Sequence, residues 1–252
     1  MEDITTHHTN MNNEPYIDIH CHALYGIDDG APDIEESLRM LKEFEKLGFK
    51  KVVLTPHYKN AFHANNKIKR SLFDNLVKVA KEKGINVELY LANEVRISGD
   101  IVELLKKDEI TLLGNNLFLE LPFTNSIVNL SNVIYELQEM DINVIIVHPE
   151  RYLYLKKEDY EKLIEKDVMF QVNYESIIGT YGRESKKRVK YLLKNNMVTM
   201  IGSDSHKHDA AFFLKFDKIK KKLIKLVGEY KFRELTYENI NSLIEEAEEK
   251  EK

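Results

Sequence analysis

Short apolar runs alternate with longer amphipathic stretches along most of this chain. Runs rich in β-branched and aromatic residues predict strands, because such side chains pack well on a pleated sheet. Seven strands are expected, at residues 17–22, 51–55, 86–92, 117–121, 143–147, 168–173 and 198–201.

The stretches between these runs repeat their apolar residues with the period of a helix. Helices are expected at residues 33–47, 66–83, 128–140, 160–165, 186–194, 210–227 and 237–248. Asp33 and Glu36 have the spacing of a capping box at the start of the first helix, and Gly48 is placed to end it.

Strand–helix alternation with apolar strands predicts a parallel sheet covered by helices. Seven strands without a glycine-rich nucleotide-binding turn favour a closed α/β barrel over an open dinucleotide-binding sheet. No internal repeat or low-complexity linker interrupts the pattern, so we expect a single barrel domain at residues 16–252, preceded by a flexible tail at residues 1–15.

Composition narrows the class of protein. The chain has 252 residues, of which 43% are hydrophobic and 31% charged, so it is globular rather than disordered. Its formal net charge of −5 gives no general reason to expect a nucleic-acid partner. The single cysteine, Cys21, excludes an intrachain disulfide and fits a reducing compartment. No apolar run approaches the ~20 residues that span a bilayer, and no signal pattern precedes the first strand, so we expect a cytoplasmic protein without membrane insertion.

The candidate chemistry lies where the predicted strands end. His20 and His22 are two residues apart on a strand, so both imidazoles project to the same side. Five further apolar runs end in histidine or a carboxylate, and the carboxyl ends of barrel strands are where such folds gather their active sites. The candidate metal ligands are His20, His22, Asp29, His57, Glu94, Glu120, His148, Asp204 and His206. Mixed nitrogen and oxygen ligands without thiolate suit Mn, Fe or Zn, and nine of them fit two or three ions that share bridging carboxylates.

Each candidate taken singly has an ordinary explanation. A lone histidine at a strand end is more often a hydrogen-bonded core or loop residue than a ligand. Glu94 and Glu120 fit solvated strand-end carboxylates, and residues 204–206 fit a helix cap. The arrangement of all of them at corresponding strand ends is what indicates a metallohydrolase.

Several motifs together resemble the PHP (polymerase and histidinol phosphatase) superfamily. Within it, they most resemble the bacterial capsule and exopolysaccharide branch of metal-dependent protein-tyrosine phosphatases. The resemblance runs from about Tyr16 to the end of the chain. The motifs are Asp18-Ile19-His20-Cys21-His22, Gly26-Ile27-Asp28-Asp29-Gly30, Glu35-Glu36-Ser37-Leu38, Thr55-Pro56-His57, Asn93-Glu94, His148-Pro149-Glu150-Arg151-Tyr152 and Gly202-Ser203-Asp204-Ser205-His206.

This resemblance implies a distorted (β/α)7 barrel with three divalent ions, Mn before Fe, Zn or Mg. By position, His20, His22, Glu94 and Asp204 would hold one ion, and Glu94, Glu120 and His148 a second. Asp29, His57 and His206 would hold the third. Arg151 matches the phosphate-binding arginine of the family, although without the resemblance it reads as a surface loop residue.

The resemblance also implies direct hydrolysis by water that the metal ions activate. The leaving group would be a tyrosine phenolate, which needs little protonation because its parent pKa is about 10. A cysteine nucleophile is not expected, because cysteine phosphatases need an arginine six residues after the cysteine and Ile27 stands there. Cys21 also alternates away from His20 and His22.

The chain departs from the family pattern around the site. Tyr58 replaces a common histidine, Tyr25 a common proline and Ser205 a common alanine. Tyr58, His63 and Arg183 are expected near the substrate entrance. A loop near the site follows the spacing of the family at Gln171, Asn173, Ser176, Gly179 and Gly182.

The expected substrate is a phosphotyrosine protein, the tail of a membrane tyrosine kinase that controls polysaccharide export. The alternatives are a phosphatase for histidinol phosphate or another small phosphoester, a non-catalytic scaffold, and a DNA-processing nuclease. A non-catalytic scaffold would be free to lose metal ligands, but all nine are present. The net charge of the chain does not favour the nuclease. The helix from Asp33 carries Glu35, Glu36 and Arg39, which fit either a solvated face or a contact between copies in a homo-oligomer.

Overall fold

The computed structural model describes residues 15–59, 61–125 and 129–250. Its strands are all parallel and form two hydrogen-bonded groups, β1-β2-β4 and β3-β5-β6-β7-β8-β9. The strands are β1 (Tyr16–Cys21), β2 (Phe49–Leu54), β3 (His57–Tyr58), β4 (Glu88–Leu91), β5 (Glu94–Arg96), β6 (Asn116–Glu120), β7 (Asn143–Val147), β8 (Met169–Asn173) and β9 (Met200–Gly202).

Two of the predicted strands are each followed closely by a second, short strand that the sequence did not predict. β2 and β3 are separated only by Thr55 and Pro56, and β4 and β5 only by Ala92 and Asn93. Pro56 cannot donate a ladder hydrogen bond, and its carbonyl accepts instead from Glu94 N (3.2 Å) and Asn93 Nδ2 (2.8 Å). The nine strands therefore occupy seven positions, and the seven predicted strand regions are confirmed.

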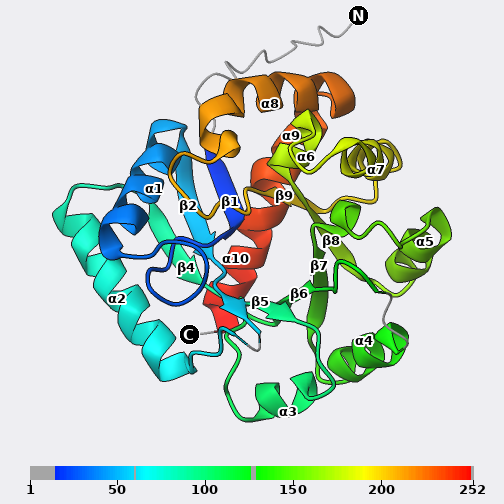
Figure 1. Ribbon diagram of the computed structural model, residues 1–252, viewed down its shortest axis with the longest axis horizontal. Helices are drawn as coiled ribbons and strands as arrows, with labels where there is room; N and C mark the ends of the chain where they lie inside the picture. Colours follow the sequence, from blue (N-terminus) through cyan, green and yellow to red (C-terminus); the bar gives the residue numbers. More distant parts are fainter. Residues whose placement is uncertain (1–14, 60, 126–128, 251–252) are drawn as a thin grey trace, which may run out of the picture.

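The first and last strands meet and close the barrel. Cys21 pairs with Ser205 in a parallel bridge, His22 N donates to Ser205 O (2.9 Å), and Asp204 N donates to His20 O (2.8 Å). Asp18 also accepts from both Ser203 N (2.7 Å) and Ser203 Oγ (2.8 Å). The architecture is thus the distorted seven-stranded α/β barrel that the sequence predicted (Figure 1).

Helices surround the strands, as the alternation predicted. They are α1 (Ile34–Lys46), α2 (Asn66–Glu82), α3 (Ile101–Lys106), α4 (Leu130–Gln138), α5 (Lys157–Ile164), α6 (Tyr174–Ile178), α7 (Arg183–Lys194), α8 (Ala211–Val227), α9 (Glu229–Arg233) and α10 (Asn239–Lys250), with a 3-10 turn η2 (Pro149–Arg151) and a π turn η3 (Glu234–Glu238). The sequence did not predict α3, α6 or α9, whose five or six residues are too few to show a helical period. Part of the helix expected at 128–140, and all of the expected tail except Pro15, lie outside the described residues.

Only half of the predicted capping box at α1 forms. Asp33 Oδ1 accepts from Glu36 N (2.9 Å), as expected of an N-cap. The Glu36 carboxylate does not return to the Asp33 backbone, because it accepts instead from His208 N (2.8 Å) and from Arg39 Nε (2.9 Å). A long-range contact has replaced the local one.

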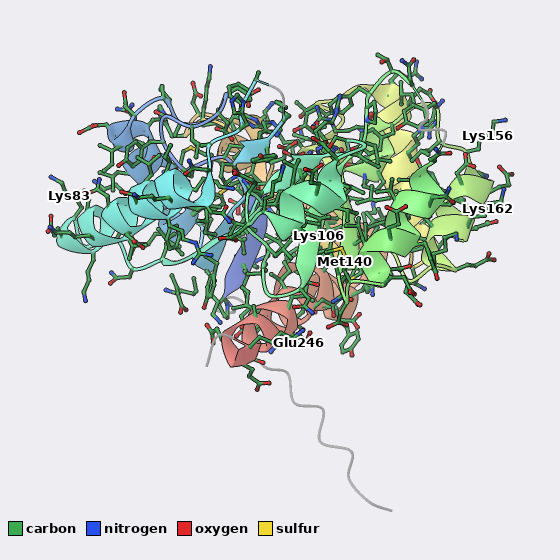
Figure 2. All side chains as sticks on the ribbon, turned by 90° about the horizontal axis from the view of Figure 1, so that it is seen from below. Lys83, Lys106, Met140, Lys156, Lys162 and Glu246 are labelled. Atoms are coloured by element: carbon green, nitrogen blue, oxygen red, sulfur yellow. The ribbon has the colours of Figure 1, made fainter. Side chains whose placement is uncertain are left out.

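The barrel interior is apolar at the end where the strands begin. Ile17 and Ile19 of β1, Phe118 of β6 and Ile145 of β7 form one buried cluster with Ile240 and its neighbours on α10. The C-terminal helix therefore closes this end of the barrel, as Figure 2 shows from below. Cys21 lies in the other cluster, which packs between strands and outer helices, so it faces away from the interior as predicted.

Candidate metal centre

The nine predicted ligands converge at the opposite end, where the strands finish. His20 lies on β1, His57 on β3, Glu94 on β5 and Glu120 at the end of β6. His22, Asp29, His148, Asp204 and His206 follow β1, β7 and β9 in loops. Two of these loop residues have a left-handed backbone, His148 with φ 37° and Asp204 with φ 52°. Such strain outside glycine persists where the surrounding structure enforces it, and it is concentrated at functional sites.

Four ligand atoms form a compact cage. His20 Nε2 lies 3.3 Å from His22 Nε2, 3.4 Å from Glu94 Oε2 and 3.6 Å from Asp204 Oδ1. His22 Nε2 lies 3.3 Å from Glu94 Oε2 and 3.4 Å from Asp204 Oδ1. Ligand bonds of about 2.1 Å in tetrahedral geometry separate the ligand atoms by about 3.4 Å, so these separations are typical of ligands that share a divalent ion. His20, His22 and Asp204 form a group that could hold one ion, and Glu94 lies beside its two histidines.

Glu94 connects this cage to the next groups. Its Oε1 lies 2.9 Å from His148 Nε2, and its Oε2 lies 2.8 Å from His57 Nδ1. His57, Glu94 and Glu120 also form a group that could hold an ion. One carboxylate therefore faces two possible ion positions, which is the arrangement of a bridging ligand.

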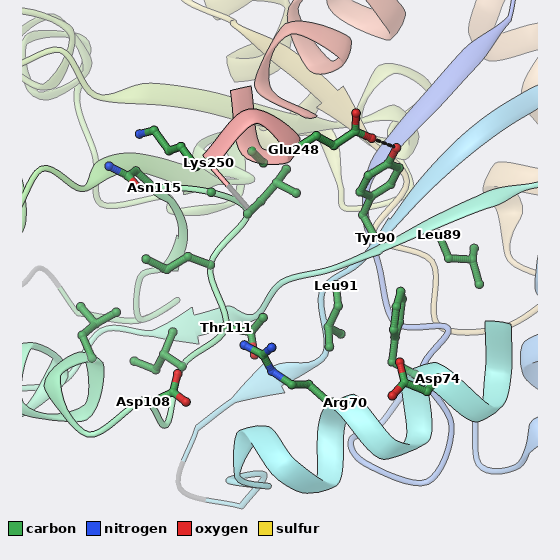
Figure 3. A pocket seen from close by; sticks show the side chains of 17 residues that line it. Arg70, Asp74, Leu89, Tyr90, Leu91, Asp108, Thr111, Asn115, Glu248 and Lys250 are labelled. Carbon is green, nitrogen blue, oxygen red and sulfur yellow. Dashed lines mark hydrogen bonds between the residues drawn. The ribbon is translucent and has the colours of Figure 1, made fainter. Parts of the chain in front are cut away.

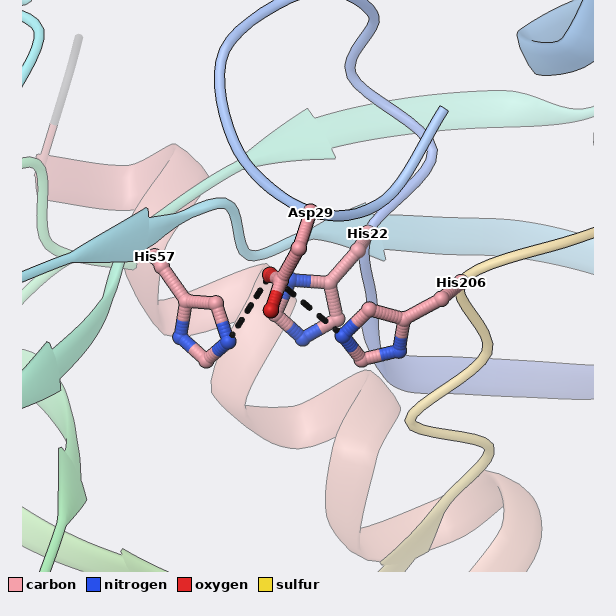
Figure 4. Close-up of side chains that lie close together, drawn as sticks. All are labelled: His22, Asp29, His57 and His206. Atoms are coloured by element: carbon pink, nitrogen blue, oxygen red, sulfur yellow. Dashed lines mark ion pairs between the residues drawn. The ribbon is translucent and has the colours of Figure 1, made fainter. Parts of the chain in front are cut away.

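A third group gathers around Asp29 (Figure 4). Asp29 Oδ1 lies 3.3 Å from His57 Nε2 and 3.8 Å from His206 Nε2. The His206 ring stacks on His22 with centroids 4.0 Å apart, and His22 belongs to this group as well. Asp29 is about half exposed while His57 is buried, so this group forms the solvent side of the site.

Several buried polar atoms of these residues make no hydrogen bond, although Glu94 Oε2 lies within ion-pair distance of His57 and Glu120 Oε2 lies 3.1 Å from Arg96, and such atoms fit metal ions. Among the described residues, His57 Nδ1, His148 Nδ1, Glu94 Oε2 and Glu120 Oε2 are buried and make no hydrogen bond. Leaving such groups unsatisfied costs stability, and native structures avoid it unless a ligand completes the site. Coordination by cations would satisfy Glu94 and Glu120 together.

The pKa values of the histidines differ. Although burial opposes the change, the neighbouring carboxylates raise the pKa of His20 and His22, whereas two other histidines suit coordination directly. Burial lowers the pKa of His148 to about 4 and that of His206 to about 4, so both imidazoles are neutral and able to coordinate. Burial alone would raise the pKa of Glu94, but the neighbouring imidazoles, His20 first, hold it well below its usual value. Burial, and then the charge of Glu94, raise the pKa of Glu120. Cations bound between these two buried carboxylates would relieve the repulsion that raises the pKa of Glu120.

Residues behind the ligands set their orientation. His22 Nδ1 donates to Asp28 Oδ2 (2.8 Å) and His20 Nδ1 donates to Gln171 Oε1 (2.8 Å), which leaves both Nε2 atoms free to coordinate. Asn173 Nδ2 donates to Asp204 Oδ2 (2.7 Å), so Asp204 Oδ1 faces the cage. The sequence placed Gln171 and Asn173 near the site only because their spacing follows the family pattern. It predicted no role for Asp28, although Asp28 stands beside Asp29 in the Asp-Asp-Gly segment.

Two glycines allow this close packing. A Cβ on Gly30 would lie 2.1 Å from the His22 carbonyl oxygen, and one on Gly202 would lie 2.9 Å from the Cβ of His20. Any side chain at either position would displace a histidine of the cage.

A buried lysine, Lys69, contacts the residue that precedes Glu94. Lys69 Nζ donates to Asn93 Oδ1 and to Glu109 O, and Asn93 Oδ1 also accepts from Thr111 N (2.9 Å). Burial lowers the pKa of Lys69 to about 7. Lys69 carries no sequence signal that separates it from the other lysines of α2, so its role could only be seen in the structure.

Arg151 lies at the rim of the centre and is mostly buried. Its Nη1 donates to Asp204 Oδ2 (2.8 Å), and its guanidinium lies over the rings of Phe123 (4.7 Å) and Tyr181 (4.3 Å). The reading of Arg151 as an ordinary surface arginine is therefore wrong. The same holds for the solvated reading of Glu94 and Glu120, which are buried, and for the helix-cap reading of residues 204–206, because α8 begins only at Ala211.

A cavity of about 970 Å³ opens beside the centre. Its lining includes Glu120, Tyr58, His63, Arg96 and Phe123. Tyr58 and His63, two of the three residues expected near the substrate entrance, line this cavity. Arg183 is exposed on α7 and is not part of this lining.

A separate cavity of about 800 Å³ lies between α2 and the C-terminal helix (Figure 3). Tyr90 at its wall donates to Glu248 Oε1 (2.6 Å). None of the nine candidate ligands lines this cavity. None of the helices within the described residues is both long and apolar enough to cross a bilayer.

In this parallel barrel, imidazoles and carboxylates gather at the carboxyl ends of the strands. That arrangement is typical of metal-dependent hydrolases. The chain belongs to the capsular polysaccharide synthesis family CpsB/CapC, whose model matches residues 16–245.

Named proteins and a solved structure agree with this membership. The chain is 31% identical over 195 residues to the putative tyrosine-protein phosphatase CapC of Staphylococcus aureus, covering 75% of this chain and 76% of that protein. It is 29% identical over 195 residues to the tyrosine-protein phosphatase YwqE of Bacillus subtilis, covering 75% and 77%. Crystal structures of YwqE and of Streptococcus pneumoniae CpsB are described as unique metal-dependent tyrosine phosphatases. The matched chain has a TM-score of 0.73 and 26% identity, over 87% of this chain and 95% of its own length.

Proposed function

We propose that this protein is a metal-dependent protein-tyrosine phosphatase. The observation that carries the proposal is the convergence of nine nitrogen and oxygen ligands beside Arg151, among them buried atoms that make no hydrogen bond. Membership in a family whose relatives are named tyrosine phosphatases supports the same reaction.

We assign the ligands to three divalent ions. His20, His22, Glu94 and Asp204 would hold the first, and both histidines lie within 3.6 Å of each of the two carboxylates. Glu94, Glu120 and His148 would hold the second, and Asp29, His57 and His206 the third. His57 also approaches Glu94, and His22 approaches the Asp29 group, so adjacent ions would lie close together. Mn is our first choice of metal, because the resemblance to the family's phosphatases implies it; the ligands themselves suit Mn, Fe and Zn alike.

Bound ions would supply an activated water and Lewis-acid stabilisation of the phosphoryl oxygens. The protein supplies positioning and charge. Arg151 is held by Asp204 on one side and by two aromatic rings, so its planar fork needs no reorganisation to bind a phosphate. The charge of Asp204 keeps the pKa of Arg151 raised although burial opposes it, so the guanidinium stays charged.

The rim favours an aryl phosphate. Phe123 is partly exposed and stacks on His148 with centroids 5.6 Å apart and planes 17° from parallel. A phosphotyrosine whose phosphate meets Arg151 would bring its ring against Phe123, where aromatic contact adds binding energy. The adjoining cavity of about 970 Å³ has room for the polypeptide around the tyrosine.

The proposed partner is the phosphorylated tail of a membrane tyrosine kinase that controls capsular or exopolysaccharide export, in keeping with the family's role in capsular polysaccharide synthesis. A cytoplasmic location follows from that substrate and from the single buried cysteine.

The test is phosphate release from a phosphotyrosine peptide by metal-stripped protein, before and after reloading with Mn. We expect turnover only in the reloaded protein and none in His148→Ala. Arg151→Ala should lower kcat/KM by about 10²–10³-fold, the range for loss of one transition-state donor. Arg70→Ala, an exposed arginine on α2, is the matched control. Turnover of histidinol phosphate but not of the peptide would overturn the substrate assignment in favour of a small phosphoester.

A further inference from the structure

Four lysines on two neighbouring helices form a cluster that the proposed chemistry does not use. Lys186 and Lys190 are one turn apart on α7, and Lys218 and Lys222 are one turn apart on α8. The two helices are in contact and lie side by side in Figure 1. We refer to these four residues as the lysine cluster.

The lysine cluster is not neutralised within the described chain. None of the four makes an ion pair there, whereas Lys187 beside them pairs with Glu184 (2.7 Å). Slight desolvation and the charges of the other three lysines lower the pKa of Lys222. The whole chain has a net charge of −5. Four neighbouring positive charges that repel one another are therefore a local feature of this surface and do not follow from the composition of the chain.

The cluster is continuous with the rim of the metal centre. Lys186 Nζ donates to Ile178 O (3.4 Å), just before the turn that carries Tyr181 against Arg151. Helix α7 also packs on η2, the turn that contains Arg151. Positive charge therefore extends from the phosphate-binding end of the barrel outward along α7 and α8.

The structure favours a polypeptide over a membrane as the occupant. Membrane-surface helices insert an apolar face beside their lysines. Of the apolar residues of α8, Leu214 is exposed, whereas Phe212, Phe216 and Ile219 are buried in the core, Phe212 against Phe49 and Phe216 against Tyr16. What α8 presents outward is chiefly lysine, with Asp217 as its one carboxylate.

We propose that the lysine cluster docks an acidic segment of the phosphotyrosine protein, at a distance from the tyrosine that is hydrolysed. This rests on the proposed function, because it describes the partner of that same site. Exposed charges of this kind speed association and are screened by salt, so docking should lower KM and leave kcat unchanged.

The experiment compares Lys218→Gln/Lys222→Gln with wild type, both as Mn-loaded full-length protein. The control is Lys78→Gln/Lys81→Gln, which removes two exposed lysines from α2. The substrates are p-nitrophenyl phosphate, a short phosphotyrosine peptide, and the same peptide with a glutamate- and aspartate-rich extension. We expect the extension to raise kcat/KM of wild type and of the control at low salt. Loss of two exposed charge contacts should remove about three- to tenfold of that gain in the cluster variant. Turnover of p-nitrophenyl phosphate should not change.

Direct binding separates this proposal from the proposed function. Fluorescence anisotropy of the unphosphorylated acidic peptide should show binding to wild type that the cluster variant weakens, whether or not any phosphate is released. Equal binding and equal kcat/KM in the two proteins would overturn the docking role. Loss of binding to phosphatidylglycerol vesicles with unchanged peptide binding would overturn it too, and would assign the surface to a membrane.

Discussion

The two ends of this barrel are built from the same strands and differ in almost every other respect. At the closed end, Ile17, Phe118 and Ile145 pack against α10 with little solvent exposure. At the open end, His20 and Glu120 occupy the same strands only two or three residues further on. In a parallel barrel, the residues that stabilise the fold and the residues that carry the chemistry are therefore separated along the direction of the strands.

The two ends also differ in how they are stabilised. The closed end gains free energy from apolar burial in the protein alone. The open end contains buried carboxylates and imidazoles with unsatisfied atoms, which oppose folding until a ligand completes them. Metal binding should therefore stabilise the protein in proportion to affinity and concentration, and the substitutions below test the two ends separately.

The largest effect is expected at Glu94. Glu94→Gln keeps the shape of the side chain but removes the charge that faces His20, His22 and His148. Metal-dependent kcat/KM should fall by about 10³-fold or more, because ions contribute several kcal/mol of transition-state stabilisation. Circular dichroism should show the same fold, and metal content by mass spectrometry should decrease. Activity within tenfold of wild type would rule out the bridging role.

The opposite result is expected at the closed end. Phe118→Ala should lower the free energy of unfolding by about 3–5 kcal/mol, through lost burial and a cavity beneath α10. The activity of the folded fraction should stay near that of wild type. Urea unfolding gives the first quantity, and Phe118→Leu should show a smaller loss. A large loss of specific activity at full folding would mean that the two ends are not separable.

A smaller effect is expected behind the ligands. Asp28→Asn weakens the acceptor that orients His22 and should reduce metal affinity by about 10–100-fold, the usual range for such partners. Isothermal titration with Mn measures this affinity. The matched control is Asp33→Asn, an N-cap where asparagine serves equally well. Equal affinity in the two variants would show that Asp28 does not orient His22.

The smallest effect is a pH dependence of stability. Burial raises the pKa of Glu150 to about 7, while one of its oxygens has no partner and the other accepts from Asn173 N (2.9 Å). Because the pKa of Glu150 is higher in the folded protein than in the unfolded chain, its contribution to the free energy of unfolding is complete below about pH 4.5. That contribution is lost as pH rises through 7.

Burial raises the pKa of Asp18 to about 7 as well, so both carboxyl groups contribute over the same range. Glu150→Gln should therefore reduce the fall in unfolding free energy of the metal-free protein between pH 5 and 8, without abolishing it. An unchanged pH profile would contradict a buried, protonated Glu150.

The sequence by itself determined the parts of this protein that depend on local order. Seven strand regions and the long helices were predicted because alternation and helical periodicity are properties of neighbouring residues. His20 and His22 could be paired because both lie on one strand, where spacing sets direction. The remaining ligands could be ranked as candidates only through their positions at strand ends and their resemblance to known motifs.

Only the tertiary structure decided how those candidates meet. Closure of β1 on β9 brings Asp18 to Ser203 and His20 to Gln171, contacts between residues more than 150 positions apart. The left-handed backbone at His148 could not be predicted, because a residue before proline ordinarily adopts an extended conformation. Glu36 and Lys69 likewise form hydrogen bonds with residues that are distant in the sequence. Local pattern specifies elements, but the free energy of burying charge in a closed barrel selects which polar side chains end up together.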